Sequence, residues 1–384
     1  MIVTLLAFCA ALIWLTALWL AFLGTLKAHE HFERSPKIVP HPLEPVSILK
    51  PVKGLEPSLR GNLESFFKLD YHQYEILFSI AREDDPARPL IEELICAHPK
   101  IPARLLIGDA GVGPNPKVNN LIQSYQASRF DWIVISDSNV QVPRDYLLCT
   151  TAEFTPDVGV VTAVVAGTRS RTMGGLLESI YLNTFYARWM FIAREFGQDC
   201  VVGKSMLFRK SVAERFGGIL QLGRFLAEDY MTGQAMRMLG LKVKMMRRPI
   251  EQPLSRYTFR DFWLRHIRWG RIRKSQAPLP IFFEPLTMMF PSGAMGAFAL
   301  YIFAGLPTGL VFLAHVSLWF ILDLSLMKSL GQKPRFMLLP GWLLRECLAL
   351  PLWIQTICGN TVMWRGSRLK VKTGGLLEAQ IENT

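Results

Sequence analysis

The first 26 residues constrain the fold of this chain most, because they form one uninterrupted apolar block. Residues 2–26 (IVTLLAFCAALIWLTALWLAFLGTL) contain no charged side chain, and Lys27 follows them. About 20 apolar residues are enough for a helix to cross the hydrocarbon core of a bilayer. The block lacks the basic start and small-residue cleavage site of a signal peptide, and it is too long for one. We therefore expect residues 1–26 to form a retained transmembrane helix.

The charges that follow predict how this helix is oriented. Lys27, Arg34 and Lys37 come after the apolar block, whereas only the amino terminus precedes it. The positive-inside rule then places the residues after the helix in the cytoplasm. The formal net charge of +12 suits an anionic bilayer surface or a phosphorylated substrate. No nucleic-acid-binding motif accompanies this charge, so we expect no nucleic-acid partner.

The central part of the chain has the pattern of an α/β domain. Short apolar runs lie at 46–51, 74–80, 103–109 and 131–137, with further strand candidates at 158–167 and 200–209. Helical patterns separate these runs, which indicates β-α-β units and a mostly parallel sheet. Ligands of such sheets bind beyond the carboxyl ends of the strands. We expect this domain to cover 46–257 and a polar, proline-containing linker to cover 27–45.

The chain becomes strongly apolar again near residue 281. Residues 281–305 and 306–327 are two membrane candidates, and a third block at 336–364 is interrupted by Pro340, Arg345, Glu346 and Pro351. Basic residues on both flanks of the third block favour a re-entrant or interfacial segment over a crossing, which stays the alternative. We expect a membrane region at 281–364 and a basic cytoplasmic tail at 365–384.

The run WIVISDSNV, residues 132–140, sends a predicted buried strand into Asp137. A buried carboxylate needs a positive partner or access to water. Asp137 and Asn139 offer two hard oxygen ligands in one turn, and Mg²⁺ takes its other ligands from phosphates and water. The same letters are also common in plain turns and at helix starts. A metal site and a structural turn both stay open at this point.

Glu228 and Asp229 stand at the start of a helical pattern, FLAEDYMTGQAMRMLG at 225–240. The helix dipole favours acidic residues there, which is a sufficient structural explanation. The alternative is catalytic, with Asp229 accepting a proton from an attacking hydroxyl group.

The segment 258–280 contains a basic helical pattern, DFWLRHIRWGRIRKSQ at 261–276. Arg265, Arg268 and Trp269 are spaced by three and four residues, so they share one helical face. A basic amphipathic helix beside membrane segments is usually a surface anchor. Arginine and tryptophan on one face also suit an anionic diphosphate. The two roles are compatible.

Smaller features follow three other predicted strands. Glu83, Asp84 and Asp85 come after strand 74–80, where contacts to a ribose or a base would fall. Lys117 and Asn119 stand at a helix start in NPKVNN and suit phosphate oxygens, and Lys53 follows the first strand as a further basic candidate.

Together these stretches resemble the ceramide glucosyltransferase family. The motifs that carry the likeness, in order, are VSILKPVKGLEP, YEILFSIAREDDPA, GPNPKVNNL, SDSN, CVVGKSMLFRK, AEDY and RHIRW. This family belongs to the family-2-like glycosyltransferases with a GT-A fold, and it has bacterial relatives that include hopanoid-associated enzymes. The resemblance implies that Asp137 lies in the metal and nucleotide site and that Asp229 is the catalytic base. It also implies that Arg265, Arg268 and Trp269 (RxxRW) hold the diphosphate and the acceptor.

Two positions depart from the family pattern. Arg82 stands where the ceramide enzymes carry an aspartate, so which of Glu83, Asp84 and Asp85 binds the nucleotide stays open. Tyr186 stands where the animal enzymes have a histidine, which bears on the acceptor more than on the reaction.

The resemblance implies an inverting, Mg²⁺- or Mn²⁺-dependent transfer of a hexose from a UDP-sugar to a lipid hydroxyl. Ceramide is the first expected acceptor and a hopanoid the alternative, in a bacterial inner membrane with the catalytic domain in the cytoplasm. A processive polysaccharide synthase would need more membrane helices and usually a glutamine at Arg265. A membrane-anchored lipid-binding protein without turnover is the non-enzymatic alternative.

Overall fold

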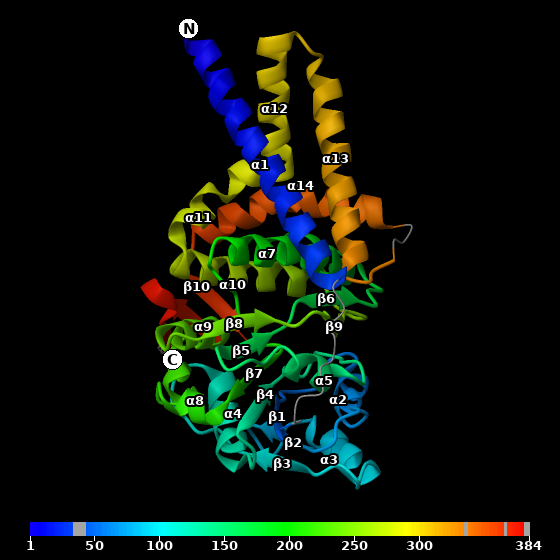
Figure 1. Ribbon diagram of the computed structural model, residues 1–384, viewed down its shortest axis with the longest axis vertical. Helices are drawn as coiled ribbons and strands as arrows, with labels where there is room; N and C mark the ends of the chain where they lie inside the picture. Colours follow the sequence, from blue (N-terminus) through cyan, green and yellow to red (C-terminus); the bar gives the residue numbers. More distant parts are fainter. Residues whose placement is uncertain (34–43, 334–336, 365–366, 380–384) are drawn as a thin grey trace. The chain divides into compact units, whose positions relative to one another are not determined.

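The computed structural model describes residues 1–33, 44–333, 337–364 and 367–379, and the chain divides into two compact units (Figure 1). The sheet unit comprises 34–170, 197–256 and 375–384, and the helical unit comprises 1–33, 171–196 and 257–374. The units therefore interleave along the sequence, whereas we expected one continuous domain at 46–257. Residues 171–196 join the helical unit because their buried apolar side chains, such as Ile180, pack with those of its other helices.

A seven-stranded sheet forms the centre of the sheet unit, with strand order β3-β2-β1-β4-β7-β5-β8. Its strands are β1 (Val46–Pro51), β2 (Tyr74–Ile80), β3 (Ala103–Ile107), β4 (Trp132–Ile135), β5 (Val158–Thr162), β7 (Met206–Arg209) and β8 (Lys242–Met245). All neighbours run parallel except β7, which is antiparallel to β4 and β5. The predicted α/β class is confirmed.

The strand predictions hold best where strands are fully buried. Every residue of β1 and β2 is buried, which produces the continuous apolar runs seen in the sequence. The predicted strand 158–167 is instead two strands, because β6 (Val165–Thr168) leaves the main sheet and pairs with β9 (Ile250–Pro253). Of the predicted strand 200–209, only the last four residues form β7.

The helices of the sheet unit are α2 (Leu59–Phe66), α3 (Arg88–Ala97), α4 (Pro116–Ala127), α5 (Tyr146–Thr151), α8 (Lys210–Glu214) and α9 (Glu228–Met238), with a 3₁₀ helix at Ile219–Arg224. Helix α4 packs Leu121 and Ile122 into the main core beside Leu49 and Leu77. It begins at Asn115, whose side chain accepts hydrogen bonds from two backbone N–H groups, with Pro116 in the first turn. This start fixes the orientation of Lys117.

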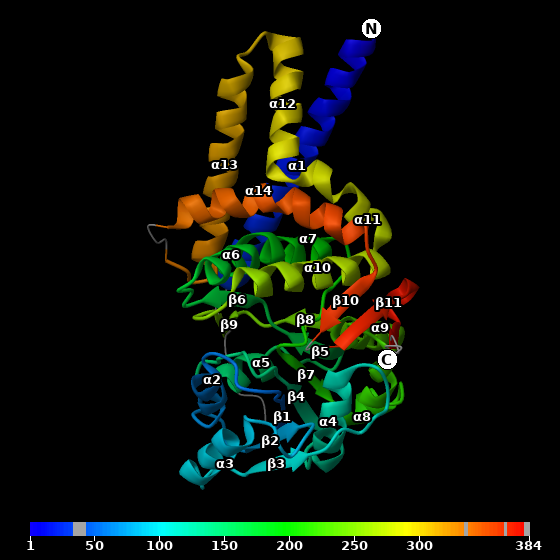
Figure 2. The ribbon, with the colours of Figure 1, turned by 180° about the vertical axis from the view of Figure 1, so that it is seen from behind.

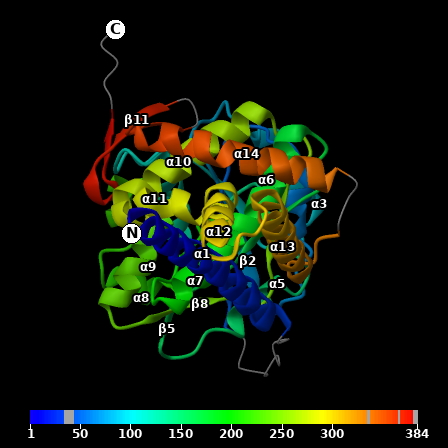
Figure 3. The same ribbon diagram turned by 90° about the horizontal axis from the view of Figure 1, so that it is seen from above.

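The helical unit contains α1 (Ile2–Glu33), α6 (Met173–Tyr181), a π-helical turn (Leu182–Tyr186), α7 (Ala187–Glu195), α10 (Phe259–Gln276), α11 (Pro278–Phe283), α12 (Met289–Ala304), α13 (Thr308–Ser329) and α14 (Leu338–Ile357). Helices α1, α12 and α13 lie side by side, and α14 runs across them (Figures 2 and 3). A short hairpin of β10 (Thr361–Trp364) and β11 (Ser367–Val371) follows α14. Trp364, the last residue of the predicted membrane region, thus ends strand β10, and residue 365, where the tail was predicted to begin, lies outside the described residues.

Two helices, α1 and α13, are long and apolar enough to cross a membrane within the described ranges. A third span would be the pair Pro278–Thr287 and Met289–Ala304, which is bent by 57° at its break. Large apolar side chains such as Leu5, Phe8 and Leu313 are exposed on these helices, as a bilayer requires. The chain is therefore a membrane protein. Helix α14, the predicted re-entrant segment, is not among these candidate spans, and whether it re-enters or crosses stays a prediction.

Helix α1 extends beyond its predicted end at residue 26. Lys27 Nζ lies 3.2 Å from Oε2 of Glu30, and His29 Nε2 lies 2.9 Å from Oε1 of Glu33. Such pairs at three- and four-residue spacing support the last turns. The predicted linker 27–45 is therefore helical up to Glu33, and its residues 34–43 lie outside the described residues.

Candidate active site

A cluster of lysines and carboxylates lies at the edge of the main sheet where β1 and β4 end. The Nζ of Lys117 lies 2.7 Å from Asp137 Oδ1 and 2.8 Å from Glu228 Oε1. It also donates a hydrogen bond to the carbonyl oxygen of Gly203 at 3.0 Å. Burial alone would lower the pKa of Lys117, but Asp137, Glu228 and Asp229 raise it above its usual value. Lys117 is therefore a permanent positive charge that joins three segments of the chain.

Lys204 brings a second positive charge to the turn after β4. Its Nζ donates to Oδ1 of Asn139 and lies 3.7 Å from Oδ2 of Asp137. The side chain of Lys204 is almost fully buried, whereas that of Asp137 is 27% exposed. The carboxylate that ends the buried strand is thus balanced by protein side chains, and it also reaches solvent. Sequence reasoning missed Lys204, although it stands in the motif CVVGKSMLFRK.

Lys50 supports the same turn from inside the sheet. It is fully buried, and its Nζ donates to the backbone oxygen of Asp137 at 2.6 Å and to Ser136 Oγ at 3.3 Å. The ammonium also lies 3.8 Å from the ring centroid of Phe66. Burial lowers the pKa of Lys50 well below its usual value, and Asp137 opposes that shift. Lys53, the basic residue predicted for the site after β1, is exposed instead.

Asp229 lies at the start of α9, as predicted, and its carboxylate faces the same cluster. Oδ2 accepts a hydrogen bond from the backbone N–H of Gly203 at 2.8 Å, and Oδ1 accepts one from the N–H of Tyr230 at 2.8 Å. Burial and the neighbouring Glu228 raise the pKa of Asp229 to about 6. A carboxylate with this pKa can accept a proton efficiently near neutral pH.

Glu228 has a different role from its neighbour. Its carboxylate is nearly buried, pairs with Lys117 and accepts a hydrogen bond from Asn115 Nδ2 at 3.2 Å. It therefore anchors the start of α4 to the start of α9.

Gly203 is the point at which these groups approach the backbone. A Cβ atom there would lie 2.8 Å from Lys117 Nζ and 3.1 Å from Asp229 Oδ2, closer than ordinary packing permits. Glycine is therefore required for Asp229 and Lys117 to sit against this backbone segment.

Of the acidic residues 83–85, the structure brings one to the carboxyl ends of β1 and β2. Asp85 accepts hydrogen bonds from the N–H of Gly54 at 3.0 Å and of Ala87 at 2.9 Å, so it joins the loops after both strands. Asp84 pairs with Arg82 at 2.7 Å, and Glu83 pairs with Arg88 at 2.9 Å, on the surface.

Asn119 does not join the cluster. Its amide bonds twice to the backbone of Gly113, at 3.0 and 3.2 Å, and so closes its own loop. The next residue, Asn120, donates to the carbonyl oxygens of Val52 and Ser79, both at 3.1 Å, and ties together the ends of β1 and β2. Sequence reasoning missed Asn120.

The RxxRW face lies on α10 in the helical unit. The guanidinium of Arg265 lies 4.3 Å from the ring centroid of Trp269, so these two side chains share a face as predicted. Arg265 is buried and pairs with Glu178 of α6 at 3.0 Å. Arg268 is more accessible than Arg265. The ring centroid of Tyr186, which stands where the animal enzymes have a histidine, lies 5.1 Å from that of Trp269.

Asp137 and Asn139 carry oxygen atoms of the kind that a hard cation binds, and in the structure Lys117 and Lys204 contact these oxygens. Within the parts of the chain that the structure describes, no group of three or more His, Cys, Asp or Glu side chains could hold a metal ion. Mg²⁺ needs only one or two protein carboxylates when phosphates and water supply the rest. The carboxylate of Asp137 and the amide oxygen of Asn139 meet this need, and both are shared with Lys204.

Comparisons with known proteins agree with this fold. The structure of a mannosyltransferase from Pyrobaculum calidifontis, in complex with GDP-Man and Mn²⁺, aligns with a TM-score of 0.51 at 17% identity, over 85% of this chain and 97% of that one. The fold is therefore that of a GT-A glycosyltransferase. The family model "Glycosyl transferase family 21" matches residues 1–377. The chain belongs to this family and is a glycosyltransferase, as the sequence motifs indicated.

Relatives of known activity are similar over most of the chain. Ceramide glucosyltransferase 1 of Caenorhabditis elegans is 33% identical over 347 residues, which cover 88% of this chain and 74% of the relative. The ceramide glucosyltransferase of Komagataella phaffii is 27% identical over 454 residues, covering 94% of this chain and 89% of the relative.

Proposed function

We propose that this membrane glycosyltransferase transfers a hexose from a UDP-sugar to a hydroxyl group of ceramide or a related lipid. The observation that carries the proposal is the position of Asp229. Its carboxylate is held by the N–H of Gly203, beside the ammonium of Lys117, near the carboxyl ends of the parallel strands β1 and β4. The 33% identity to a ceramide glucosyltransferase supports the lipid acceptor.

Asp229 acts as the general base in this proposal. Unprotonated Asp229 takes the proton of the lipid hydroxyl while the hydroxyl oxygen forms a bond to the anomeric carbon. The bond from that carbon to the UDP oxygen breaks, and its electron pair leaves with UDP. A single displacement inverts the anomeric centre, so an α-linked donor yields a β-glycoside. The hydrogen bonds to Oδ1 and Oδ2 orient the carboxylate for this step.

Positive groups of the chain stabilise the leaving diphosphate. Lys117 and Lys204 are the two ammonium groups beside Asp137. Asp137 and Asn139 would hold Mg²⁺ or Mn²⁺, which when bound supplies further charge to the diphosphate. Preorganised charge of this kind is usually the largest contribution to such reactions.

The remaining binding roles fall to the acidic run 83–85 and to the RxxRW helix. Asp85, at the ends of β1 and β2, is favoured over Glu83 and Asp84 for the nucleotide, and Lys53 precedes Gly54, whose N–H donates to Asp85. On the RxxRW helix, Arg265 is buried against Glu178, which supports a positioning role, and Arg268 then contacts the diphosphate or the acceptor.

We further propose the bacterial inner membrane as the location, with the sheet unit in the cytoplasm, because basic residues follow α1. Two or three candidate spans within the described ranges support a lipid acceptor better than a polysaccharide export channel.

Sugar transfer by the purified protein tests the proposal. UDP-glucose, UDP-galactose and UDP-N-acetylglucosamine would be supplied with ceramide or a polyhydroxylated hopanoid, in Mg²⁺ or EDTA. We expect metal-dependent transfer to ceramide, and a loss of about 10²- to 10⁴-fold in Asp229→Asn. Asp157→Asn, at an exposed aspartate that pairs with Lys242, is the matched control and should keep full activity. Transfer only to the hopanoid would mean that the acceptor is a hopanoid and not ceramide. Full activity of Asp229→Asn would mean that Asp229 is not the base. No UDP release with any pair of substrates would favour a non-catalytic lipid-binding protein.

A further inference from the structure

A cavity of ≈ 50 Å³ lies inside the helical unit, between α10 and the apolar helices. Apolar and aromatic side chains form most of its wall, including Tyr181, Phe262 and Trp353. Helices α1 and α13, both long enough to cross a membrane, contribute Ala21 and Trp319. At about 10–15 Å³ for each water-sized group, the cavity holds about three to five such groups. That is the size of a small polar head, not of an acyl chain.

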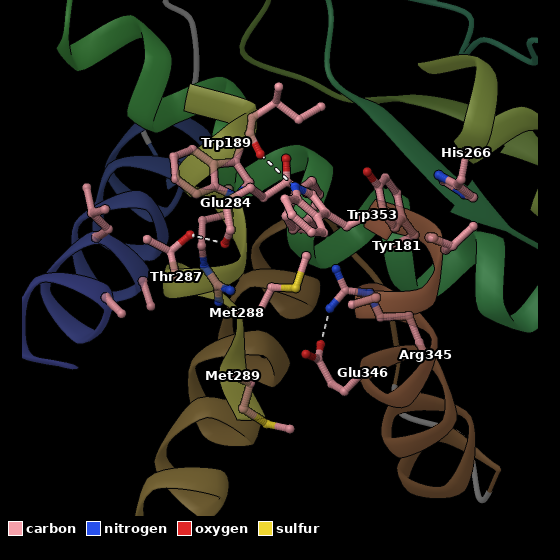
Figure 4. A pocket seen from close by; sticks show the side chains of 18 of the residues that line it. Tyr181, Trp189, His266, Glu284, Thr287, Met288, Met289, Arg345, Glu346 and Trp353 are labelled. Carbon is pink, nitrogen blue, oxygen red and sulfur yellow. Dashed lines mark hydrogen bonds and ion pairs between the residues drawn. The ribbon is translucent and has the colours of Figure 1, made fainter. Parts of the chain in front are cut away.

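The charges around the cavity cancel one another. Arg345 pairs with Glu346, and both line the cavity (Figure 4). Arg273 pairs with Glu284, which also lines it, at 2.7 Å. Arg188 pairs at 2.7 Å with Asp323 behind the wall. Each cation thus has its own carboxylate, so the cavity has no net charge to attract a phosphate.

His266 brings a hydrogen-bonding atom without a partner to this wall. The residue is 4% exposed, lines the cavity and packs 3.8 Å from the ring centroid of Tyr181. Its Nε2 lies 2.8 Å from Oε2 of Glu178, while its buried Nδ1 has no hydrogen-bond partner among the described residues. A buried polar atom of this kind costs free energy until a ligand or water satisfies it.

The partner of Nε2 determines what Nδ1 can bind. Glu178 also pairs with Arg265, and a carboxylate beside a guanidinium is a hydrogen-bond acceptor, so Nε2–H of His266 donates to it. Burial lowers the pKa of His266, against the pull of Glu178, which keeps the imidazole neutral. Nδ1 is then a hydrogen-bond acceptor. Its partner must be an O–H or N–H donor.

We propose that this cavity binds the uncharged polar head of the acceptor lipid, with His266 Nδ1 accepting a hydrogen bond from its amide N–H or a hydroxyl group. The proposal rests on the lipid-glycosylating function above and adds a requirement on the lipid. The head must be neutral and must carry a hydrogen-bond donor, as an N-acylated amino alcohol does. A phosphatidylglycerol fails the first condition, and a fully methylated lipid fails the second.

Photo-crosslinking without nucleotide sugar tests the site directly. A diazirine-bearing ceramide should label peptides of α10 or α14, and Asp229→Asn should be labelled as strongly as the wild type. His266→Gln keeps an amide donor for Glu178 but loses the acceptor, so labelling should fall about three- to tenfold. His266→Asn keeps an oxygen near the Nδ1 position and should lose less. The comparison uses both variants only if they unfold at the same temperature as the wild type, so that reduced labelling does not reflect loss of folding.

Competition by modified lipids provides a test that needs no variant. Unlabelled ceramide should compete with the probe, whereas ceramide methylated at its amide nitrogen and hydroxyl groups should compete about three- to tenfold more weakly. Equal competition, equal labelling of His266→Gln, or stronger labelling by a diazirine phosphatidylglycerol would each overturn the inference. Transfer to ceramide without labelling of the cavity would refute the site alone. Labelling of the cavity without transfer to any acceptor would support the site and refute the function.

Discussion

The two units hold their buried charges in different ways. In the helical unit, Arg188 of α7 and Asp323 of α13 form a closed pair at 2.7 Å, with 6% and 2% of their side chains exposed. Trp342 of α14 donates to the other oxygen of Asp323 at 2.7 Å. In the sheet unit, Asp137 is shared by Lys117 and Lys204 and is 27% exposed. The first arrangement joins helices, and the second keeps an accessible cluster of charges.

The difference shows which buried charges have a structural role. In a closed pair the two charges neutralise each other inside the protein, so no net charge remains to attract an ionic ligand. A carboxylate that two ammonium groups share, and that water reaches, can exchange partners when an anion or a cation arrives. Burial of charge alone therefore does not identify an active site. The number of partners and the access of solvent do.

Removal of one partner of the closed pair should have the largest effect on stability. Asp323→Leu leaves Arg188 buried without its carboxylate, which costs about 3–5 kcal/mol of the free energy of unfolding. The double variant Arg188→Leu/Asp323→Leu should recover most of that loss, because no unpaired charge remains. Unfolding in detergent measures both. The control is Asp157, which forms an exposed ion pair with Lys242. Asp157→Leu should change the free energy of unfolding little. A double variant no more stable than Asp323→Leu would contradict a closed pair.

Replacement of a lysine in the accessible cluster should affect activity instead. Lys204→Met removes a charged hydrogen bond to Asn139, a type of interaction that contributes about 1.5–3 kcal/mol, and so should lower kcat/KM about ten- to hundredfold. The unfolding temperature should fall much less than in Asp323→Leu. Steady-state kinetics with the productive donor measure the effect, and Lys68→Met, on the surface, is the control. Normal kcat/KM in Lys204→Met would remove this lysine from the proposed site.

The pH dependence of kcat/KM should reflect the protonation of Asp229 in the same accessible cluster. Because burial and Glu228 raise the pKa of Asp229 from 3.8 to about 6, the base is protonated below that pH. We expect kcat/KM to fall about tenfold for each pH unit below about 6 and to level off above it. The free energy of unfolding should change with pH in the opposite direction to kcat/KM. Between these two pKa values the folded protein keeps a proton on Asp229 that the unfolded chain releases. Asp229 therefore opposes folding increasingly as pH rises through that window. A pH profile without an acid limb would contradict Asp229 as the base.

The sequence predicted the cluster residues one by one but not their contacts. Asp137, Lys117 and Asp229 were each selected from a local pattern, a strand end or a helix start, and the fold brings them together through Lys117 and Gly203. Lys50 and Lys204 were missed because a lysine in an apolar strand or loop has no local signal that its ammonium is buried. Only the neighbouring strands and turns supply the partners that make this burial possible.

Two other differences have the same physical origin. Asn119 has the sequence position of a phosphate ligand, but its amide bonds to its own loop, which no residue spacing reveals. Glu178 lies in an apolar helix and reads as an isolated charge until Arg265 and His266, almost 90 residues later, are placed beside it. Local patterns predicted elements well, whereas partners distant in sequence required the fold.

The smallest expected effect separates two adjacent carboxylates that the sequence could not rank. Asp85→Ala removes the hydrogen bonds that join the loops after β1 and β2, so the KM for the UDP-sugar should rise about three- to tenfold. Asp84→Ala removes only a surface contact to Arg82 and should leave KM unchanged. Initial rates at varied donor concentration distinguish the two. An equal rise in both variants would mean that the acidic run acts through its overall charge. A rise in Asp84→Ala alone would assign the nucleotide contact to Asp84, and the surface pair with Arg82 would then have to open when the donor binds.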